Sequence, residues 1–460
     1  MKSDIINTAD SYKHTMFRQY PPKTIRISSY IESRGGDYDF TLFNGLQPIL
    51  SALKAPTRKQ VNQRAIRYAQ HGISFDRDMW LAVADLGYLP LKIQAVREGT
   101  ILPTKNVLVQ TVNTDDRFAP LTTHVETKLL KVWYPITVAT RSRKIKNILK
   151  TYLALSSDDA SGLDFMLHDF GYRGVSSDES AAIGGCAHLI NFKGTDTGAA
   201  LDYAEDYYSD PMAGFSVDAM EHSTVTSWGR DREKAAYENM INNCSKPGAI
   251  YSIVSDSYDI FNAVSNLFGE ALKDKIIEGG GRLVIRPDSG DPVKVNLKIL
   301  SILEQKFGMT VNSKGYKVLP SFLRILQGDG VNEHSIEKMC SAITKAGYSI
   351  ENMVFGMGGE LLQNMNRDTL KFAMKASAIK TENDYWADVV KDPITDPGKR
   401  SKAGRLALVY NKNTGWETIR ETDLGDRVNM LEDVFENGKI LRDQTLSEIR
   451  ALAETDVYTA

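Results

Sequence analysis

Short apolar runs alternate with helical patterns from about residue 160 onwards. Each run ends abruptly in a polar or glycine-rich cluster, as in RLVIRPDSG followed by VNLKILSILEQKF. Seven runs follow this rhythm, and an eighth, LKFAMKASAI, comes last. Alternating strands and helices are typical of βαβ units around a parallel sheet. Seven or eight units predict closure into an α/β barrel, with an open doubly wound sheet as the alternative. A capping box, Ser176-x-x-Glu179, predicts where the first barrel helix begins.

The first 150 residues or so show a mixed pattern instead. Alternating apolar and polar positions around Ile25, Leu91 and Val107 predict half-buried strands. Helical periodicity marks 57–85 and 118–134, and Pro135 suits the first turn of a further helix.

The change of pattern also predicts the domain borders, because no Pro/Ser-rich linker interrupts the chain. We expect an N-terminal mixed α+β domain at 1–155 that contributes dimer and substrate contacts. The α/β barrel should occupy 156–395, and a C-terminal segment, 396–460, should pack back on the N-terminal domain.

Composition excludes several classes of protein. The 460 residues carry a formal charge of −2, which does not favour binding to nucleic acid or to an anionic membrane. Three widely separated cysteines argue against a disulfide framework and a structural zinc. The N-terminus lacks the apolar core of a signal peptide, and no apolar stretch approaches the roughly 18 residues of a membrane span. We expect a soluble cytoplasmic protein.

Reactive side chains follow the predicted barrel strands. In such a barrel the carboxyl ends of the strands carry the chemistry. A single His or Asp at this position is usually a cap or a turn residue, but seven units in register indicate one pocket. The strand-end residues are His168, Asp169, Arg173, Asp196, Glu221, His222, Ser255, Asp256, Arg286, Asp288, Gly328, Asp329, Gly356, Gly358 and Gly359.

The residue types in this ring suggest the ligand. Arginines beside glycine-rich turns can bind phosphates, and GMGG at 356–359 precedes a helix whose N-terminus could hold one. Asp288 and Asp329 could accept hydrogen bonds from sugar hydroxyls or help to hold Mg²⁺. Phe170 and Tyr172 offer faces for a flat ring. A nucleotide-like substrate is indicated, but no single reaction.

Longer motifs then add a resemblance. The chain closely resembles the nicotinamide phosphoribosyltransferase family, within the type II phosphoribosyltransferases, over nearly its whole length and in family order. The motifs are DSYKHTMFRQYPP (10–22), WYPITVAT (133–140), HDFGYRGVSS (168–177), NFKGTDT (191–197), EHST (221–224), VSDSYDI (254–260), IRPDSG (285–290), QGDGVN (327–332), GMGG, KDP (391–393) and KRSKAGRL (399–406).

The resemblance implies transfer of phosphoribosyl from 5-phosphoribosyl-1-pyrophosphate to nicotinamide, giving nicotinamide mononucleotide and pyrophosphate in NAD salvage. It implies an irregular α/β barrel with an N-terminal α+β domain. It also implies Mg²⁺ bound with pyrophosphate, and a homodimer with residues of both subunits in each site. ATP is expected to phosphorylate His222, with Asp259 orienting the imidazole.

The same resemblance assigns the ring pocket. Phe170 should stack on one face of the pyridine ring, Tyr12 of the partner subunit should cover the other, and Arg173 should lie nearby. Asp196 should accept a hydrogen bond from the carboxamide NH₂. Two like charges about 4 Å apart repel by roughly 4 kcal/mol at an effective dielectric of about 20. Asp196 should therefore reject nicotinate, which carries a carboxylate in place of the amide.

Two further groups of residues match the family's phosphoribosyl contacts. Ribose and 5′-phosphate contacts are Arg286, Asp288, Ser255, Gly328, Asp329, Gly358 and Gly359. Basic residues around the phosphates and pyrophosphate, some donated across the dimer, are Arg34, Arg367, Lys375, Lys391 and Lys399. The metal ligands themselves are not assigned.

The chain departs from the family pattern at four positions. Phe165 replaces a tyrosine beside the ring, and Asp218 replaces a proline before the phosphohistidine loop. Glu360 replaces a glycine after GMGG, and Ala373 replaces a serine. Glu360 would add a negative charge near the phosphate cradle.

Three other readings remain open from the sequence. A nicotinate phosphoribosyltransferase would share the chemistry, although Asp196 argues against it. A barrel aldolase or sugar-phosphate isomerase is a second alternative, and the absence of an obvious Schiff-base lysine at a strand end of this chain counts weakly against the aldolase. A non-catalytic signalling or scaffold protein is opposed by the intact Asp196, Arg286, Asp288 and His222.

Overall fold

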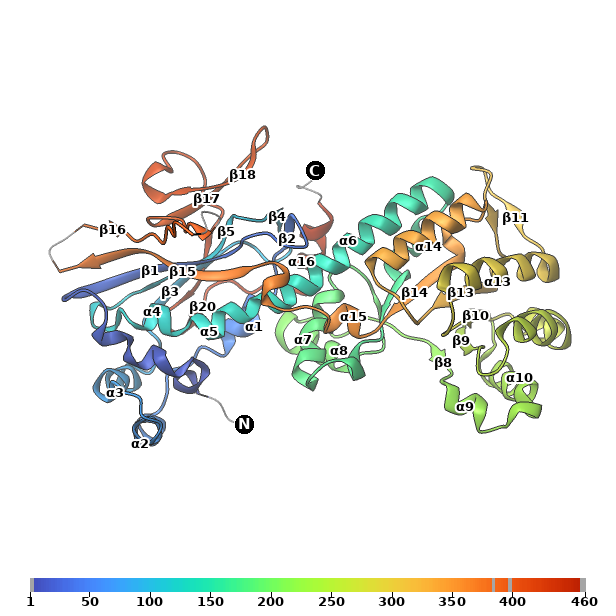
Figure 1. The fold of residues 1–460 in the computed structure, drawn as a ribbon, viewed down its shortest axis with the longest axis horizontal. Helices are drawn as coiled ribbons and strands as arrows, with labels where there is room; N and C mark the ends of the chain where they lie inside the picture. The colour runs from blue at the N-terminus through green and yellow to red at the C-terminus, as the bar shows by residue number, and fades with distance from the viewer. Residues whose placement is uncertain (1–3, 383–384, 396–398, 456–460) are drawn as a thin grey trace. The chain divides into compact units, whose positions relative to one another are not determined.

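The chain folds into two compact units, seen in a computed structural model that describes residues 4–382, 385–395 and 399–455 (Figure 1). Unit 1 comprises the described residues of 1–140, 207–209 and 365–460, and unit 2 comprises 141–206 and 210–364. The long helix α6 (Trp133–Ser156) begins in unit 1 and ends in unit 2. None of the described helices is long and apolar enough to cross a membrane.

Unit 2 is built on a sheet of seven parallel strands. Their order across the sheet is β7-β6-β14-β13-β10-β9-β8. The strands are β6 (Leu167–Asp169), β7 (Gly194–Thr195), β8 (Asp218–Ala219), β9 (Ile250–Val254), β10 (Arg282–Arg286), β13 (Leu323–Gln327) and β14 (Met353–Met357). All seven predicted runs are therefore strands of one sheet.

The sheet closes on itself. Phe215, just before β8, forms a parallel bridge with Gly194 of β7 at the opposite edge. The Thr195 amide donates to the Phe215 carbonyl at 3.0 Å, and the Phe215 amide donates to the Lys193 carbonyl at 2.7 Å. We call this junction the seam. It confirms the predicted barrel over the open sheet, and the two-residue strands beside it make the barrel irregular.

Helical segments connect the barrel strands. They are α7 (Asp178–His188), α8 (Gly198–Tyr208), α9 (His222–Thr226), α10 (Glu233–Cys244), α11 (Ile260–Asn262), a π-helix (Ala263–Ala271), α12 (Lys273–Glu278), α13 (Pro292–Phe307), α14 (Glu333–Lys345) and α15 (Gly359–Leu362). A small hairpin pairs β11 (Thr310–Val311) with β12 (Lys317–Val318).

Local sequence explains where several of these helices start. Proline at the first position of α13 follows Asp291, whose carboxylate accepts from the Lys294 amide at 3.0 Å. The predicted capping box of α7 was one residue early. Ser177 is the N-cap, and its hydroxyl oxygen accepts from the Ser180 amide at 3.1 Å.

Unit 1 contains a second seven-stranded sheet, which is antiparallel. Its order is β16-β15-β1-β5-β3-β19-β20, built from β16 (Ala387–Asp388), β15 (Phe372–Thr381), β1 (Thr24–Ser33), β5 (Val107–Asn113), β3 (Leu91–Ala95), β19 (Glu432–Glu436) and β20 (Lys439–Ile440). The eighth apolar run is β15, which pairs antiparallel with β1 (Figure 1). The prediction that it could add an eighth barrel strand was wrong.

The described residues of unit 1 also form six complete α-helices and two smaller antiparallel sheets. The helices are α1 (Leu46–Ser51), α2 (Arg58–Gln70), α3 (Arg77–Leu86), α4 (Leu121–His124), α5 (Glu126–Leu129) and α16 (Leu446–Glu454). One small sheet pairs β2 (Phe40–Leu42) with β4 (Ile101–Pro103), and the other is the hairpin of β17 (Leu406–Asn411) and β18 (Gly415–Arg420). The predicted helix at 57–85 is two helices. The chain turns between them, where Gly72 has a φ of 81°.

Candidate active site

A pocket of about 540 Å³ lies at the carboxyl ends of the barrel strands, where the sequence predicted it. Eleven residues that the sequence predicted line it: Phe170, Tyr172, Arg173, Asp196, Glu221, Arg286, Asp288, Gly328, Asp329, Gly358 and Gly359. They lie at or just after the carboxyl ends of six strands, β6, β7, β8, β10, β13 and β14. The barrel topology thus gathers residues that lie up to 189 positions apart in sequence, from Phe170 to Gly359.

The Phe170 ring is held by the neighbouring strand. Its backbone amide donates to the Met357 carbonyl at 2.9 Å. The ring lies so close to Gly356 that a β-carbon there would come within 2.1 Å of its Cε2 atom. Glycine in β14 therefore gives the ring room to lie against the backbone. Phe170 is half-buried, so part of its ring faces the pocket.

Asp196 is exposed in the pocket and is held from two sides. Its backbone amide donates to the Asp169 carbonyl at 2.9 Å. The hydroxyl of Ser216, next to the seam residue Phe215, donates to the Asp196 carboxylate. A carboxylate fixed in this way can accept a hydrogen bond from a ligand NH₂ group.

Close backbone approaches shape the pocket at two further places. A β-carbon on Gly328 would come within 2.6 Å of the Asp288 carboxylate oxygen Oδ1. A β-carbon on Gly174 would come within 2.9 Å of the Gly359 Cα. Glycines at both places bring loops together and leave backbone groups accessible to a ligand. The one-turn helix α15 starts at Gly359.

Arg286 and Asp288 are two of the polar residues that line the pocket. The guanidinium NH2 of Arg286 donates to the Met220 carbonyl at 3.0 Å, and its Nε is buried without a hydrogen-bond partner among the described residues. Burial raises the pKa of Asp288, while the positive charge of Arg286 opposes this shift. Arg286 can thus donate to a ligand oxygen, and Asp288 can accept from a hydroxyl.

Carboxylates outnumber cations in the pocket. Arg173 and Arg286 face the carboxylates of Asp196, Glu221, Asp288 and Asp329. An anionic ligand placed there needs further positive charge from outside this set of residues.

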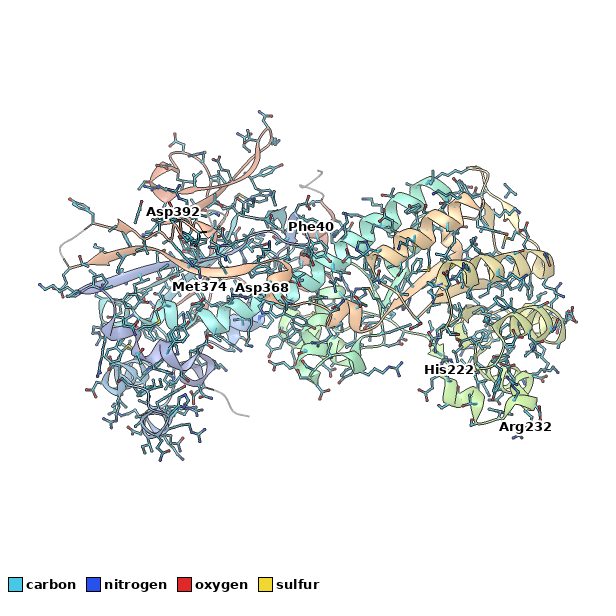
Figure 2. All side chains as sticks on the ribbon, viewed as in Figure 1. Phe40, His222, Arg232, Asp368, Met374 and Asp392 are labelled. Carbon is cyan, nitrogen blue, oxygen red and sulfur yellow. The ribbon has the colours of Figure 1, made fainter. Side chains whose placement is uncertain are left out.

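His222 begins α9 (Figure 2), and its neighbours Glu221 and Thr224 line the pocket. Its Nε2 lies 2.9 Å from the Asp256 carboxylate oxygen Oδ1. The His222 side chain is 46% exposed, whereas that of Asp256 is 5% exposed. The other oxygen of Asp256 accepts from the Asp288 amide at 3.1 Å and from the Ser289 hydroxyl at 2.5 Å. Asp256 therefore links the histidine to the loop that carries Asp288.

Asp259 does not orient His222, which corrects the prediction. Its carboxylate caps α11, accepting from the Phe261 and Asn262 amides at 3.0 Å each. The motif SDSYD offers two aspartates, and the one nearer the strand end reaches the histidine. Ser255 is also turned away from the pocket. It is fully buried, and its hydroxyl donates to the Ile253 carbonyl at 2.8 Å.

The other predicted contacts belong to unit 1. Tyr12 is 58% exposed. Burial lowers the pKa of Lys375; Glu126 opposes this shift, whereas the charges of Arg34 and Lys391 add to it. Arg34 also pairs with Glu32 at 3.0 Å.

Two more of these basic residues are exposed. Arg367 pairs with Asp368 at 3.0 Å. Lys399 directly follows residues outside the described part of the chain. Unit 1 thus carries a set of cations of its own.

The four departures lie apart from the pocket lining. The Glu360 carboxylate accepts from the Asn364 side chain at 2.7 Å, within its own turn. Ala373 is buried in β15 opposite Glu32. Asp218 is exposed in β8. One oxygen of the Glu360 carboxylate is thus bound within its own turn, one residue after Gly359, and the added negative charge near GMGG stays an expectation.

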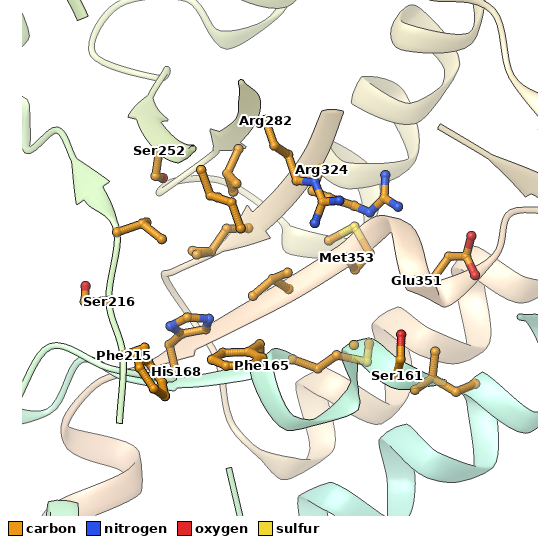
Figure 3. A pocket seen from close by; sticks show the side chains of 18 of the residues that line it. Ser161, Phe165, His168, Phe215, Ser216, Ser252, Arg282, Arg324, Glu351 and Met353 are labelled. Carbon is orange, nitrogen blue, oxygen red and sulfur yellow. The ribbon is translucent and has the colours of Figure 1, made fainter. Parts of the chain in front are cut away.

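Phe165 lines a separate cavity of about 510 Å³ inside the barrel (Figure 3). Phe165, His168 and Phe215 lie on one side of it, and Arg282 and Arg324 lie together on the other. The Phe165 and Phe215 ring centroids are 6.1 Å apart. Ser216 also lines this cavity, so the cavity reaches the residue that holds Asp196.

Sequence reasoning missed the roles of Asp169, Ser216 and Asp256. Asp169 and Asp256 were visible at strand ends, but their partners depend on which way each side chain turns. Ser216 gave no signal, because its contact with Asp196 requires the seam to form. Among the described residues, no group of three or more His, Cys, Asp or Glu side chains could hold a metal ion.

Comparison with known proteins agrees with this arrangement. Residues 165–439 match the nicotinate phosphoribosyltransferase family, and residues 4–93 match the nicotinamide phosphoribosyltransferase N-terminal domain. The chain is 49% identical to the nicotinamide phosphoribosyltransferase of Xanthomonas campestris pv. campestris (strain 8004), over 98% of each chain. It is 32% identical to the enzyme of the same name from Acinetobacter baylyi, over 97% of this chain and 96% of the relative.

Solved structures share the fold. The nicotinate-nucleotide pyrophosphorylase of Pyrococcus furiosus aligns over 99% of this chain and 96% of its own, with a TM-score of 0.66 and 16% identity. Human nicotinic acid phosphoribosyltransferase aligns over 97% and 92%, with a TM-score of 0.58 and 16% identity. The irregular barrel with a second α+β unit is the architecture of these proteins.

Proposed function

The chain belongs to the nicotinamide phosphoribosyltransferase family, and from this premise we propose that it transfers phosphoribosyl from 5-phosphoribosyl-1-pyrophosphate to nicotinamide. The products are nicotinamide mononucleotide and pyrophosphate, in NAD salvage. One observation supports the choice of ring most directly: Asp196 presents a carboxylate to the same pocket as the Phe170 ring. A neutral carboxamide can donate to that carboxylate, whereas a ring carboxylate would be repelled.

The reaction forms one bond and breaks one. The pyridine nitrogen lone pair forms a bond to the anomeric carbon of the sugar. The bond from that carbon to pyrophosphate breaks, and its electron pair leaves with the pyrophosphate. The ring becomes a pyridinium cation, and no proton transfer or protein nucleophile is needed. Phe170 and Asp196 orient the ring, so positioning supplies much of the rate acceleration.

The sugar and its phosphate fit the other side of the pocket. Asp288 and Asp329 can accept hydrogen bonds from ribose hydroxyls, and their negative charges stabilise the positive charge that develops on the sugar. Arg286 can donate to phosphate oxygens. The backbone at Gly358 and Gly359 can approach the 5′-phosphate, because no β-carbons intervene.

Mg²⁺ is part of the proposal and fits the donor set. Carboxylate oxygens, such as those of Asp288 and Asp329, are the ligands this ion prefers, and it also binds substrate phosphates. No complete cage of protein ligands exists among the described residues, which favours an ion that arrives with the pyrophosphate group. When bound, Mg²⁺ neutralises charge on pyrophosphate and eases its departure.

A homodimer with shared sites is also proposed. Four carboxylates and two arginines in the pocket leave an anionic substrate short of positive charge. The cations of unit 1, Arg34, Arg367, Lys375, Lys391 and Lys399, would supply it, some of them from the partner subunit. Tyr12 of the partner subunit would cover the ring face opposite Phe170.

ATP coupling through His222 is the last part of the proposal. Asp256 at Nε2 favours the tautomer with its proton there, so that Nδ1 keeps a lone pair. That nitrogen can attack the γ-phosphorus of ATP, forming an N–P bond as the bond to ADP breaks. Because Asp256 also binds the Asp288 amide, the phosphorylated state can alter the substrate loop directly. The three scattered cysteines support a cytoplasmic location.

The test is product formation from 5-phosphoribosyl-1-pyrophosphate and Mg²⁺, with nicotinamide and nicotinate in parallel, each with and without ATP. We expect nicotinamide mononucleotide, in larger yield with ATP. A preference for nicotinate would keep the fold and the reaction and overturn our assignment of Asp196. No product from either ring would favour a non-catalytic role.

A further inference from the structure

Asp169 is a buried carboxylate directly behind the ring pocket, and the proposed reaction gives it no role. It is the last residue of β6 and is fully buried. Its Oδ1 accepts from the Gly171 amide at 2.7 Å, in the turn that connects Phe170 to Arg173. Its carbonyl accepts from the Asp196 amide at 2.9 Å. One residue thus contacts both segments that would hold the nicotinamide ring.

The surroundings of the second oxygen, Oδ2, are tightly packed. A β-carbon on Gly185 of α7 would come within 3.1 Å of it. Oδ2 is buried with no donor in ordinary hydrogen-bond geometry among the described residues. Burial raises the pKa of Asp169 to about 6, and the Gly171 amide and the Thr197 hydroxyl oppose the shift. The charge of Asp196 raises it further, so the two carboxylates interact.

Such a group lowers the stability of the fold at neutral pH. A buried carboxylate whose pKa is raised favours folding only while it is protonated, and that contribution is lost as pH rises towards 6. An asparagine could keep the oxygen that accepts from Gly171 without carrying the charge. The turn at Gly171 therefore does not require the negative charge of Asp169. A function of the protein has to explain why the charge is there.

We propose that Asp169 is a specificity-determining residue, which positions the Phe170 turn and adds a second negative charge behind Asp196, so that the pocket excludes anionic rings. This inference rests on the proposed transfer to nicotinamide. The surroundings of Asp169 favour it: the nearby Asp196 carboxylate raises the pKa of Asp169, and α7 presents glycine, which carries no charge, at the point of contact. A nicotinate carboxylate would then face two like charges.

The test compares Asp169→Asn with Asp169→Ala. Equilibrium binding of nicotinamide and of nicotinate is measured by calorimetry for the wild type and both variants, alongside turnover of each ring. Asp169→Asn should reduce the preference for nicotinamide about tenfold, because a charge behind Asp196 acts more weakly than Asp196 itself. Nicotinamide binding by Asp169→Asn should change less than about threefold, since the Gly171 hydrogen bond is kept. Asp169→Ala should weaken binding of both rings as well.

Glu98→Gln is the matched control. Glu98 is also a buried acid whose pKa burial raises, and it accepts from the Gly45 and Gln47 amides in unit 1. This variant should leave the preference between rings unchanged. The pH dependence of the wild-type preference serves if neither Asp169 variant folds, because it leaves Asp169 in place. The preference should fall as Asp169 takes up a proton below about pH 6, and a preference unchanged between pH 8 and pH 5 would overturn the role of Asp169.

The outcomes separate the two claims. If the wild type binds rings but makes no product, the proposed function fails, while a changed binding preference in Asp169→Asn still supports the role of Asp169. If the wild type is active and Asp169→Asn keeps the full preference, the role of Asp169 is overturned and the function stands. If the wild type binds neither ring, both are wrong.

Discussion

The Phe170 ring lies against the backbone of Gly356, with no room for even a methyl group between them. The contact joins the residue after β6 to a residue within β14. The contact fixes the position of the Phe170 ring relative to β14. A ligand ring that stacks on the free face of Phe170 is therefore positioned by β14 as well.

Gly356→Ala should therefore weaken nicotinamide binding. The new β-carbon would displace the Phe170 ring, and such overpacking costs about 1–3 kcal/mol. We expect the KM for nicotinamide to rise about tenfold or more, with a lower thermal midpoint. Gly162→Ala is the control, because a β-carbon there meets nothing within 4 Å. Equal KM values for the two variants would contradict the stacking role.

Asp196→Ser should admit nicotinate and weaken nicotinamide. The substitution removes the charge that repels a ring carboxylate and the strong acceptor for the carboxamide NH₂. The ratio of kcat/KM values should change by roughly 100-fold, because solvent access to Asp196 weakens its repulsion of a ring carboxylate. Parallel assays with both rings measure this ratio. Unchanged rates for both rings would show that another residue sets the selectivity.

Asp256→Asn should reduce ATP stimulation. Loss of the carboxylate removes the group that fixes the His222 tautomer, and we expect ATP hydrolysis to fall about 10- to 100-fold. Asp259→Asn is the matched variant in the same loop. It alters a helix cap, so it should cost at most about 1 kcal/mol of stability and leave the ATP effect intact. If Asp259→Asn abolished the ATP effect and Asp256→Asn kept it, Asp259 would be the residue that orients His222.

Mixed dimers test whether sites are shared. Asp288→Ala removes a pocket residue of unit 2, and Lys391→Ala removes a cation of unit 1. Each homodimer should be nearly inactive. Reassociated at equal amounts, they should regain about a quarter of wild-type activity, because one site of each heterodimer is intact. Absence of any recovery after confirmed subunit exchange would mean that each chain completes its own site.

Acid should unfold unit 1 through two buried histidines. Burial lowers the pKa of His124 to about 3 and that of His14 to about 4, and their ring centroids are 5.0 Å apart. A histidine with a lowered pKa stabilises the fold above the unfolded value of 6.5, and this contribution is lost as pH falls towards 3. Each histidine should add about 1.4 kcal/mol per pH unit to the loss.

The measurement is the free energy of unfolding from denaturant titrations between pH 7 and pH 4. His124→Gln can keep the donor to the Ile5 carbonyl that the structure allows His124, and it should make the acid slope shallower by one proton. Equal slopes for the variant and the wild type would show that other groups control acid unfolding.

Sequence patterns predicted much of this molecule for identifiable reasons. The barrel strands were visible because buried parallel strands are continuous apolar runs that end sharply in glycine or charge. The run that became β15 has the same apolar character, and only its antiparallel pairing with β1 reveals its different place. Local periodicity carries no information about which distant strand will pair.

The same limit applied to the site. Residues that follow strands, such as Asp196 and Asp288, could be placed in one pocket because topology alone brings strand ends together. The choice between Asp256 and Asp259 could not be made, since both lie in one short loop and differ in side-chain direction. Ser216 was invisible because its partner is reached across the seam.

The seam has a consequence for how this pocket can change. Asp196 and Ser216 approach each other from opposite edges of a sheet joined there by few hydrogen bonds. The strands β9, β10, β13, β14 and β6, by contrast, pair with one another over three to five residues. At the seam, a substitution near Asp196 or near Ser216 can change the ligand preference while the other strands keep their register. The junction held by a single bridge is thus the place where ligand contacts can change with the least effect on strand pairing.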